Sequence, residues 1–225
     1  MLTQAIGEFL PAAIAVALSP IPIVGIVLVL DSKRARVNGP AFAAGWVAGL
    51  AAVSVVVVVV AGQASDPGSD TATGINWLMG GIGVAFLVMA AAQWKKRPKE
   101  GEAPKMPSWM ASIASVSPPK ALGLGAALSG ANPKNLALTL AAAAAIANAG
   151  LDGTDTAVAI ALFVAIGSAT VVGAVLFYLA TPTKAARPLA GIREFMSRNN
   201  ATIMMVILLL LGAKLLGDAI SGVWT

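Results

Sequence analysis

Six apolar runs of about twenty residues each recur along this chain, and they constrain its fold more than any other feature. A helix of about 20 residues crosses the hydrocarbon core of a bilayer, which is about 30 Å thick. Charged residues make up only 11% of the 225 residues, too few for the polar surface of a water-soluble domain. The sequence therefore predicts an all-α membrane protein with one transmembrane domain and spans near 5–30, 40–61, 75–94, 121–147, 157–180 and 201–220.

The composition also limits the chemistry of the chain. It contains no Cys and no His, so it lacks thiols, disulfides and the most usual metal ligand and general base. No span offers a nucleophile–base pair or paired carboxylates. We therefore expect no enzyme activity, no metal and no cofactor. The first apolar run lacks a basic region before it and continues past its prolines, so we expect a first span there, not a signal peptide.

The basic residues are distributed very unevenly among the predicted loops. The loops after spans 1, 3 and 5 hold 13 of the 15 Lys and Arg residues, whereas the termini and the other two loops hold none. Because Lys and Arg mark the cytoplasmic side, we predict a plasma-membrane protein with both termini outside. The basic loops should attract anionic lipid headgroups, and the high charge then requires no nucleic-acid partner.

A short polar motif, LSGANPKNL at 128–136, interrupts the fourth apolar run. Pro133 breaks the helical hydrogen-bond pattern, and Lys134 is costly inside a bilayer unless it is paired or hydrated. Lys134 lies roughly 20 Å into its span at helical rise, too deep to reach the interface easily. Lys214, in contrast, can snorkel or pair with Asp218 one turn away. Lys134 is therefore the basic residue whose position calls for a role inside the membrane.

The first apolar run has a similar interruption, and the two halves of the chain align there. LSPIPIVGIVLVL at 18–30 matches LSGANPKNLALTL with one insertion, which places Pro22 opposite Pro133. Each half holds three spans, and this odd number inverts one half relative to the other. Inverted repeats with broken helices and a midplane site are common in secondary transporters. We predict six transmembrane helices in two inverted three-helix repeats, with helices 1 and 4 broken at prolines, halves at about 1–95 and 119–225, and a basic Pro-rich cytoplasmic loop at 95–120.

The residues around both breaks form the predicted substrate site. The N-terminal ends of half-helices present free N–H groups, which suit anions, and Lys134 adds a full positive charge. Proline kinks are also ordinary in membrane helices, and a lysine can cap the carbonyls of a broken helix without touching a substrate. The candidate substrate-binding residues are Ser19, Pro20, Pro22, Ser129, Asn132, Pro133, Lys134 and Asn135.

Two acidic residues are candidates for proton coupling. Glu8 is expected near the outer face, and Asp31 closes the first span at the inner face. Each also fits an interfacial acid without a role in coupling, and we give that interpretation more weight.

Small and apolar residues at helical spacing predict further packing surfaces. Gly45 and Gly49, with Ala41 one turn earlier, form a face that suits close helix packing, and this face leaves a homodimer open. The glycines at 80–83 indicate tight packing too. Two basic loops have an apolar face that suits the membrane surface, formed by Trp109, Ile113 and Val116 in one and by Leu189, Ile192, Phe195 and Met196 in the other.

The pattern as a whole resembles a known group of exporters. The six spans, the proline break in the first span and the Asn132-Pro133-Lys134 motif resemble the lysine-exporter (LysE) superfamily. Within it, LPAAIAVALSPIPIVGIVLVLDSKRARVNGPAFAAGWVAGL at 10–50 and SPPKALGLGAALSGANPKNLAL at 117–138 resemble the GAP/Sap (glycolipid-addressing protein) family of actinobacteria. The resemblance covers nearly the whole chain, and it implies a part in addressing glycolipids to the cell surface.

The function we expect is therefore membrane transport. The leading hypothesis is a transporter that exports or flips an amphiphilic glycolipid, or its precursor, from the inner leaflet outward. Amino-acid export is an alternative, because amino-acid exporters share the Asn-Pro-Lys motif. A non-transporting scaffold for lipid-assembly enzymes is a third possibility. Thiol-transferring and metal-exporting relatives are excluded, because the chain has no Cys and spans 2 to 5 contain neither carboxylates nor histidines.

Overall fold

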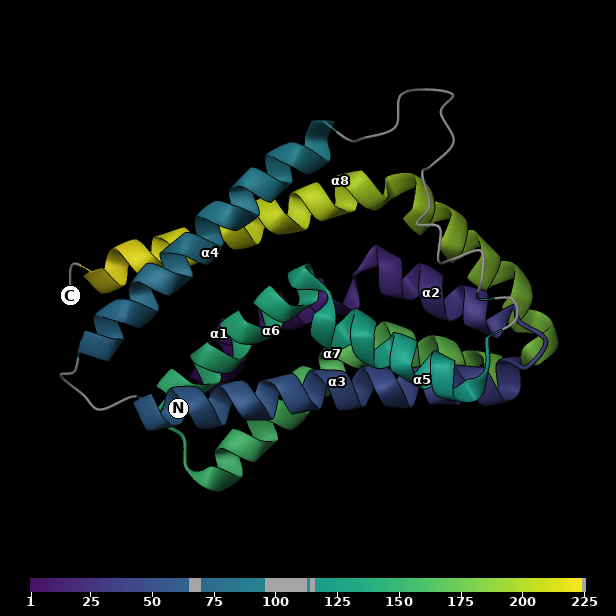
Figure 1. The fold of residues 1–225 in the computed structure, drawn as a ribbon, viewed down its shortest axis with the longest axis horizontal. Coiled ribbons are helices and arrows are strands. Elements are labelled where there is room, and N and C mark those ends of the chain that lie inside the picture. The colour runs from purple at the N-terminus through teal and green to yellow at the C-terminus, as the bar shows by residue number, and fades with distance from the viewer. Residues whose placement is uncertain (65–69, 96–112, 114–115, 224–225) are drawn as a thin grey trace.

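The described part of the chain is helical throughout. The structure is a computed structural model that describes residues 1–64, 70–95, 113 and 116–223. These residues form eight α-helices and a short π-helix, with no strand among them (Figure 1). The elements are α1 Leu2–Ala17, α2 Pro20–Leu30, α3 Ala35–Ala64, α4 Asp70–Lys95, α5 Pro118–Ala126, η2 Ala127–Ala131, α6 Pro133–Asn148, α7 Gly153–Ala180 and α8 Pro182–Val223.

Several of these helices have the length and hydropathy of membrane spans. Within the described residues, α3, α7 and α8 each contain a stretch long and apolar enough to cross a bilayer. The pair formed by α1 and α2, bent by 47° at its break, brings the number to as many as four. These helices are those of a membrane protein, as the sequence predicted.

Proline marks the start of four helices. Pro20, Pro118, Pro133 and Pro182 are the first residues of α2, α5, α6 and α8. This position tolerates proline because the first amide of a helix has no partner within the helix, and the fixed φ of proline suits the helical turn. At Pro20 and Pro133 one helical segment ends just before the proline and the next begins with it, which is how a continuous apolar run becomes a broken helix.

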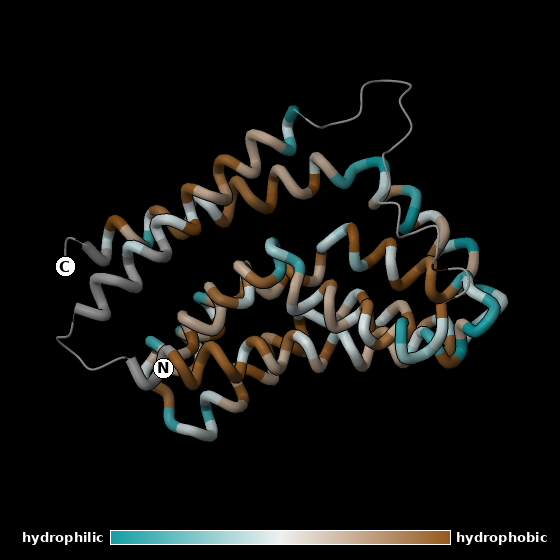
Figure 2. The backbone as a smooth tube through the Cα atoms, in the orientation of Figure 1, coloured by the Kyte–Doolittle hydropathy of each residue, from teal (hydrophilic) through white to brown (hydrophobic). Residues whose placement is uncertain are grey.

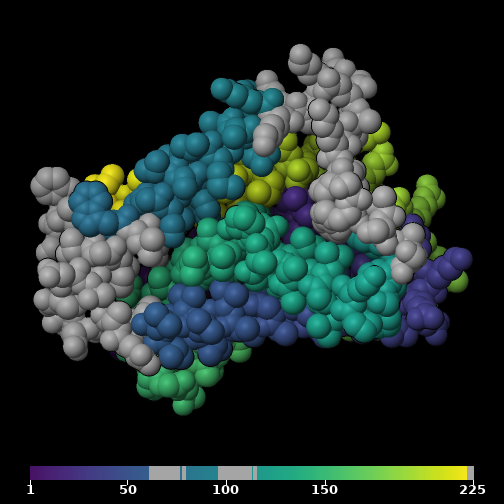
Figure 3. Space-filling model, in the orientation of Figure 1, coloured from purple at the N-terminus to yellow at the C-terminus, as the bar shows by residue number. Residues whose placement is uncertain are grey.

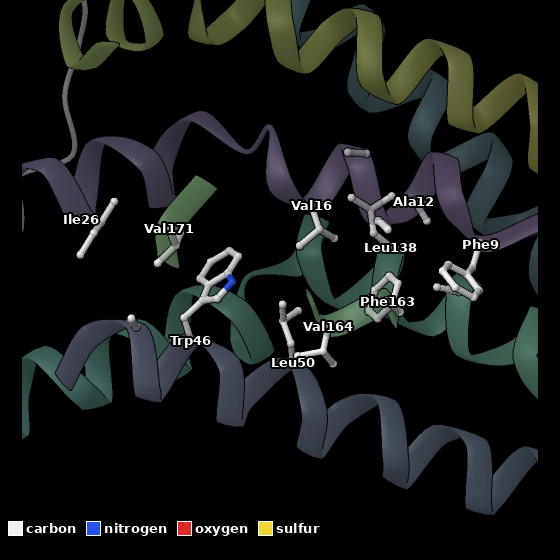
Figure 4. Close-up of a cluster of buried hydrophobic side chains, with 14 of the residues drawn as sticks. Phe9, Ala12, Val16, Ile26, Trp46, Leu50, Leu138, Phe163, Val164 and Val171 are labelled. Atoms are coloured by element: carbon white, nitrogen blue, oxygen red, sulfur yellow. The ribbon is translucent and has the colours of Figure 1, made fainter. Parts of the chain in front are cut away.

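The core lies among α1, α3, α6 and α7. Phe9 of α1 meets Phe163 of α7 edge to face, with ring centroids 6.0 Å apart. Trp46 and Leu50 of α3 and Val16 of α1 are fully buried in the same cluster (Figure 4). α3 packs against α5, η2, α6 and α7, and Figure 3 shows α5 and α6 lying on it. Both halves of the fourth apolar run, α5 with η2 and α6, thus pack against α3.

The small-residue face of α3 is used inside the chain. A Cβ atom on Gly45 would collide with the Leu122 carbonyl, and one on Gly49 with the Ser129 hydroxyl and the Ala126 carbonyl. These contacts confirm the predicted close packing. They also cover this face with α5 and η2, so it is not free to form a dimer.

α4 lies along the C-terminal part of α8 (Figure 1). A Cβ on Gly83 would come within 3.1 Å of the Gly212 carbonyl, and one on Gly212 within 2.9 Å of the Gly83 carbonyl. Gly81 has open space around it. The predicted tight packing of this glycine cluster is therefore confirmed for Gly83 and wrong for Gly81.

α8 corrects the prediction of a loop before the sixth span. The predicted loop near 181–200 is helical from Pro182, and α8 continues for 42 residues. At about 1.5 Å per residue this is about twice the thickness of a bilayer core. The helical spacing of Leu189, Ile192 and Phe195 runs directly into the last apolar run, and no proline follows Pro188 to stop it. Leu189 faces the protein, whereas Ile192 and Phe195 are exposed.

Many of the helix ends lie at two ends of the molecule. The N-terminus, the end of α8, the start of α4 and the turn between α6 and α7 lie at one end in Figure 1. The α2–α3 turn, the start of α5 and the α7–α8 junction lie at the other end, where Figure 2 shows most of the hydrophilic chain. The surface helix predicted around Trp109 falls largely outside the described residues, although Ile113 is buried.

Candidate substrate site

The first helix break leaves the Ala15 carbonyl without its helical partner. α1 ends at Ala17, and α2 begins at Pro20. The Ser19 amide donates to the Val16 carbonyl at 3.1 Å, three residues back, instead of to the Ala15 carbonyl four residues back. The Ala15 carbonyl is then left for side chains to satisfy, because a buried carbonyl without a donor is costly, and the Ser19 hydroxyl of the break lies 3.2 Å from it.

The second break leaves a similar carbonyl. Before it, the chain widens into the π-helix η2, in which a carbonyl pairs with the amide five residues on. For Leu128 that residue is Pro133, which has no N–H. Asn132 caps the new helix, since its side-chain oxygen accepts the Lys134 amide at 3.1 Å. The Leu128 carbonyl is left for a side chain to satisfy.

Two neighbouring side chains of α6 satisfy both carbonyls. Lys134 Nζ donates to the Ala15 carbonyl at 3.0 Å and to Ser19 Oγ at 2.7 Å. Asn135 Nδ2 donates to the Leu128 carbonyl at 2.9 Å, and Ser19 Oγ donates to Asn135 Oδ1 at 2.8 Å. Relative exposures of 4% for Lys134, 2% for Ser19 and 0% for Asn135 place this polar cluster inside the bundle. We call Ser19, Lys134 and Asn135 the central cluster.

The structure corrects the pairing of the two breaks. Ser19 and Asn132 are the N-cap residues of α2 and α6, and the prolines that follow them are Pro20 and Pro133. The two capped carbonyls also correspond, because each lies four residues before its N-cap residue. Pro20 is therefore the structural counterpart of Pro133. The alignment that placed Pro22 there is wrong by two residues, because the first segment contains two prolines that sequence matching cannot tell apart.

The first break offers few of the free backbone N–H groups that were expected at the start of a half-helix. Two of the first three residues of α2, Pro20 and Pro22, have no N–H, and the next amide, of Ile23, donates to the Ser19 carbonyl at 3.3 Å. Side chains therefore dominate the hydrogen-bonding capacity at this point, with Lys134 as the main donor.

Lys134 is a buried cation with only neutral acceptors around it. In the part of the chain that the structure describes, no carboxylate lies within ion-pair distance of its Nζ atom. Lys214, the other lysine in an apolar run, pairs with Asp218 at 2.6 Å, as predicted. A buried ammonium without a counter-ion has lost hydration that neutral acceptors replace only in part. An anionic group brought to the central cluster would supply the missing charge.

The other predicted site residues are placed apart from the central cluster. Ser129 is buried against Gly49 of α3 and donates to the Ala126 carbonyl at 3.1 Å, so its contacts are those of packing. Glu8 is exposed and accepts from Gln4 at 3.3 Å. Asp31 is also exposed and lies 3.5 Å from Arg193. Neither acid is near Lys134, so the structure offers no contact through which they would exchange protons with it.

Three polar residues near the breaks were not singled out from the sequence. Thr170 Oγ1 of α7 donates to the Ala17 carbonyl at 2.6 Å, at the end of α1. Thr139 Oγ1 donates to the Asn135 carbonyl at 2.8 Å. Trp46 is fully buried, and its indole N–H has no hydrogen-bond partner among the described residues. A lone hydroxyl inside an apolar run was the available signal for both threonines.

The described residues contain no group of three or more Asp or Glu side chains that would hold a metal ion.

Comparison with known families assigns the chain. A profile of the family described as Sap, sulfolipid-1-addressing protein, matches residues 9–221, which include both helix breaks and the whole central cluster. The chain belongs to this family. The predicted resemblance to the Sap proteins is thus confirmed. No match was found among curated proteins, and none among solved structures.

Proposed function

We propose that this Sap-family chain is a membrane transporter that exports or flips an amphiphilic glycolipid or sulfolipid, or a precursor of one, from the inner leaflet outward. The single observation that carries the proposal is the central cluster, where two helix breaks meet around a buried lysine that forms no ion pair within the described residues. The name of the family points to a sulfolipid, whose headgroup bears a negative charge. A cation with neutral partners at the meeting point of broken helices suits such a headgroup.

The proposed chemistry at the central cluster is an exchange of partners. Lys134 holds the Ala15 carbonyl and Ser19 when no substrate is present. An anionic headgroup is a stronger acceptor than either, because it adds a charge–charge attraction that the neutral carbonyl and hydroxyl lack. Binding would release the Ala15 carbonyl and loosen the α1–α2 break. In this proposal Lys134 caps the Ala15 carbonyl when the site is empty and binds the headgroup when substrate is present.

The proposed topology is six membrane crossings in two inverted halves, as in the lysine-exporter superfamily. The crossings are α1–α2, α3, α4, α5–η2–α6, α7 and the apolar part of α8. The packing supports this arrangement in part: α1 packs on α7 and α5 packs on α3, which are corresponding pairs in such a repeat. The basic end would face the cytoplasm, with both termini outside. We propose no catalytic activity.

The test is a comparison of two lysines. In cells that make the lipid, Lys134→Ala should reduce its appearance at the cell surface by tenfold or more while its total synthesis stays unchanged. Lys214→Ala is the matched control, because it also removes a lysine from an apolar helix but only breaks a surface ion pair. Lipid levels at the surface and in whole cells would be measured by mass spectrometry of extracts.

Other outcomes would favour the other functions. Normal surface levels in Lys134→Ala, with the variant present in the membrane, would contradict lipid export through this site. Accumulation of an amino acid inside the cell, with an unchanged lipid profile, would indicate small-solute export. Equal effects of Lys134→Ala and Lys214→Ala would indicate a scaffold without a transport site.

A further inference from the structure

A long apolar groove runs between α3 and α7. Its floor is a strip of small residues spaced four apart along α7, and its α3 side contains Val47, Ala51 and Val55. The groove has a volume of about 830 Å³, within the range typical of ligand sites. Over α7 it extends from Ala157 to Leu176, about 29 Å at helical rise, which matches the hydrocarbon core. The strip consists of Ala157, Ala161, Ala165, Ala169 and Gly173.

The groove is open, and it contains one polar group without a partner. A Cβ atom on Gly173 would meet nothing within 4 Å, and Val55 and Leu176 at its edge are 47% and 60% exposed. Ser168 lines the groove, is 3% exposed, and its hydroxyl has no hydrogen-bond partner among the described residues. A buried hydroxyl left unpaired is unfavourable, so this group points to an occupant with an acceptor such as an ester or amide oxygen.

Ser168 also places the groove relative to the central cluster. It is two residues from Thr170, whose hydroxyl donates to the Ala17 carbonyl at the first helix break. The middle of the groove is therefore at the level of that break, on the same helix. α7 separates a lipid-facing surface from the polar interior and contacts both.

A second, basic pocket lies at one end of α3 and α7. Lys33, Arg34 and Arg36 line it with Tyr178 of α7 and Pro118 of α5, around a volume of about 540 Å³. None of the three cations forms an ion pair with a carboxylate in the described part of the chain, and Asp31 close by in sequence pairs with Arg193 instead. Tyr178 is within one turn of Leu176, where the groove ends. This is the hydrophilic end of the molecule in Figure 2.

We infer that the α3–α7 groove and the basic pocket together form a binding site for one lipid with an acidic phosphate or sulfate headgroup. The acyl chain lies along the small-residue strip, an acceptor near its middle pairs with the Ser168 hydroxyl, and the headgroup binds Lys33, Arg34 and Arg36. Three cations that have no carboxylate partner in the described part of the chain, at one end of an apolar groove, complement an anionic amphiphile and give no advantage to a neutral one. The inference rests on the proposed function only for the direction of lipid movement.

The test is photolabelling of the full chain in phosphatidylcholine nanodiscs. The probes are phosphatidic acid and phosphatidylcholine that carry the same diazirine acyl chain, and the labelled peptides are mapped by mass spectrometry. We expect phosphatidic acid to label the groove segments of α3 and α7 at least fivefold more than phosphatidylcholine does. Equal labelling by both probes would overturn the inference, because the groove would then hold ordinary annular lipid.

Two pairs of variants locate the site. The first test variant replaces the pocket cations, as Lys33→Gln/Arg34→Gln/Arg36→Gln, and should lower phosphatidic acid labelling to the level of phosphatidylcholine. Its control removes the same charge outside the pocket, as Lys184→Gln/Arg187→Gln/Arg198→Gln, and should leave phosphatidic acid labelling unchanged. Ala165→Phe fills the groove and should lower labelling severalfold, whereas Ala52→Phe adds the same ring to an exposed site on α3 outside the groove and should not. Equal effects within either pair, or crosslinks from the groove to a second copy of the chain, would overturn the inference.

The outcome for the groove is separable from that for the central cluster. Lys134→Ala should reduce export by tenfold or more while selective labelling of the groove persists. Export that survives Lys134→Ala, together with selective labelling, would contradict the proposed transport site and leave the groove assignment standing. Unselective labelling together with loss of export in Lys134→Ala would contradict the groove assignment and leave the proposed transport site standing.

Discussion

The two helix breaks have the same layout but unequal chemistry. Each has an N-cap residue, a proline directly after it, and an orphan carbonyl four residues before it. At the second break, Asn132 caps its own helix by accepting the Lys134 amide. At the first, the Ser19 side chain makes no cap bond to α2 and bonds to α6 residues instead.

Pro22 contributes to this difference by removing one of the two amides that a serine N-cap can use. A serine N-cap normally accepts from the amide of the second or third helical residue; the third residue of α2 is Pro22, which has no N–H, and the Ser19 side chain makes no bond to the second, Ile21. The Ser19 hydroxyl is thereby available to accept from Lys134. The corresponding third residue of α6 is Asn135, which satisfies the Leu128 carbonyl. The second break therefore supplies the donors for both carbonyls, and the first break depends on it.

The largest loss of stability is expected at the second break. Asn135→Leu leaves the buried Leu128 carbonyl unsatisfied and removes the acceptor of Ser19, so we expect a decrease of about 2–4 kcal/mol in the free energy of unfolding. Denaturant titration in mild detergent would measure it. Asn199→Leu is the control, since Asn199 Nδ2 also donates to a carbonyl, that of Phe195, but at an exposed site. Equal losses in the two variants would contradict the bridging role of Asn135.

A smaller loss is expected at the first break. Ser19→Ala removes one partner each from Lys134 and Asn135, but both keep a backbone carbonyl, so we expect a loss of about 1 kcal/mol. Ser54→Ala is the control, because Ser54 is equally buried but bonds only within α3, to the Leu50 carbonyl. The two variants should differ in export, which falls severalfold only in Ser19→Ala. Unchanged export in both would show that the first break contributes no side chain to transport.

The tie between α7 and the first break should contribute less. Thr170→Val keeps the shape of the side chain but removes the donor to the Ala17 carbonyl, with an expected loss of about 0.5–1 kcal/mol. Thr181→Val removes a hydroxyl that donates to the Phe177 carbonyl at an exposed site and should have no measurable effect. Both unfolding free energies would be obtained by denaturant titration. An unchanged free energy of unfolding in Thr170→Val would show that the contact between α7 and the first break does not stabilise the protein.

The smallest change in stability is expected from Pro22→Ala, within about 0.5 kcal/mol. The substitution provides a third-position amide that competes for the Ser19 hydroxyl, so export should fall even though stability does not. Pro11→Ala, at an exposed proline earlier in the same apolar run, should affect neither. Export assays on reconstituted protein would check this, and full export in Pro22→Ala would contradict the role assigned to Pro22.

Sequence reasoning found the membrane class, the two breaks and the unusual lysine, because each depends on local chemistry. A proline ends a helix and a deep lysine lacks an interface wherever they occur. It misjudged the basic stretch before the last apolar run, where charge was taken as a sign of a loop although the helical spacing continued. It also mispaired the breaks by choosing Pro22 over Pro20.

Composition and local motifs are enough to predict a helical membrane chain whose first and fourth apolar runs are broken. The partner of Lys134, the Ala15 carbonyl 119 residues away in the chain, is known only from the packed helices. Every residue has a carbonyl, so sequence cannot mark the one that a break leaves unpaired. The α3–α7 groove has the same origin, because small residues every four positions become a groove only when the neighbouring helix leaves that strip uncovered.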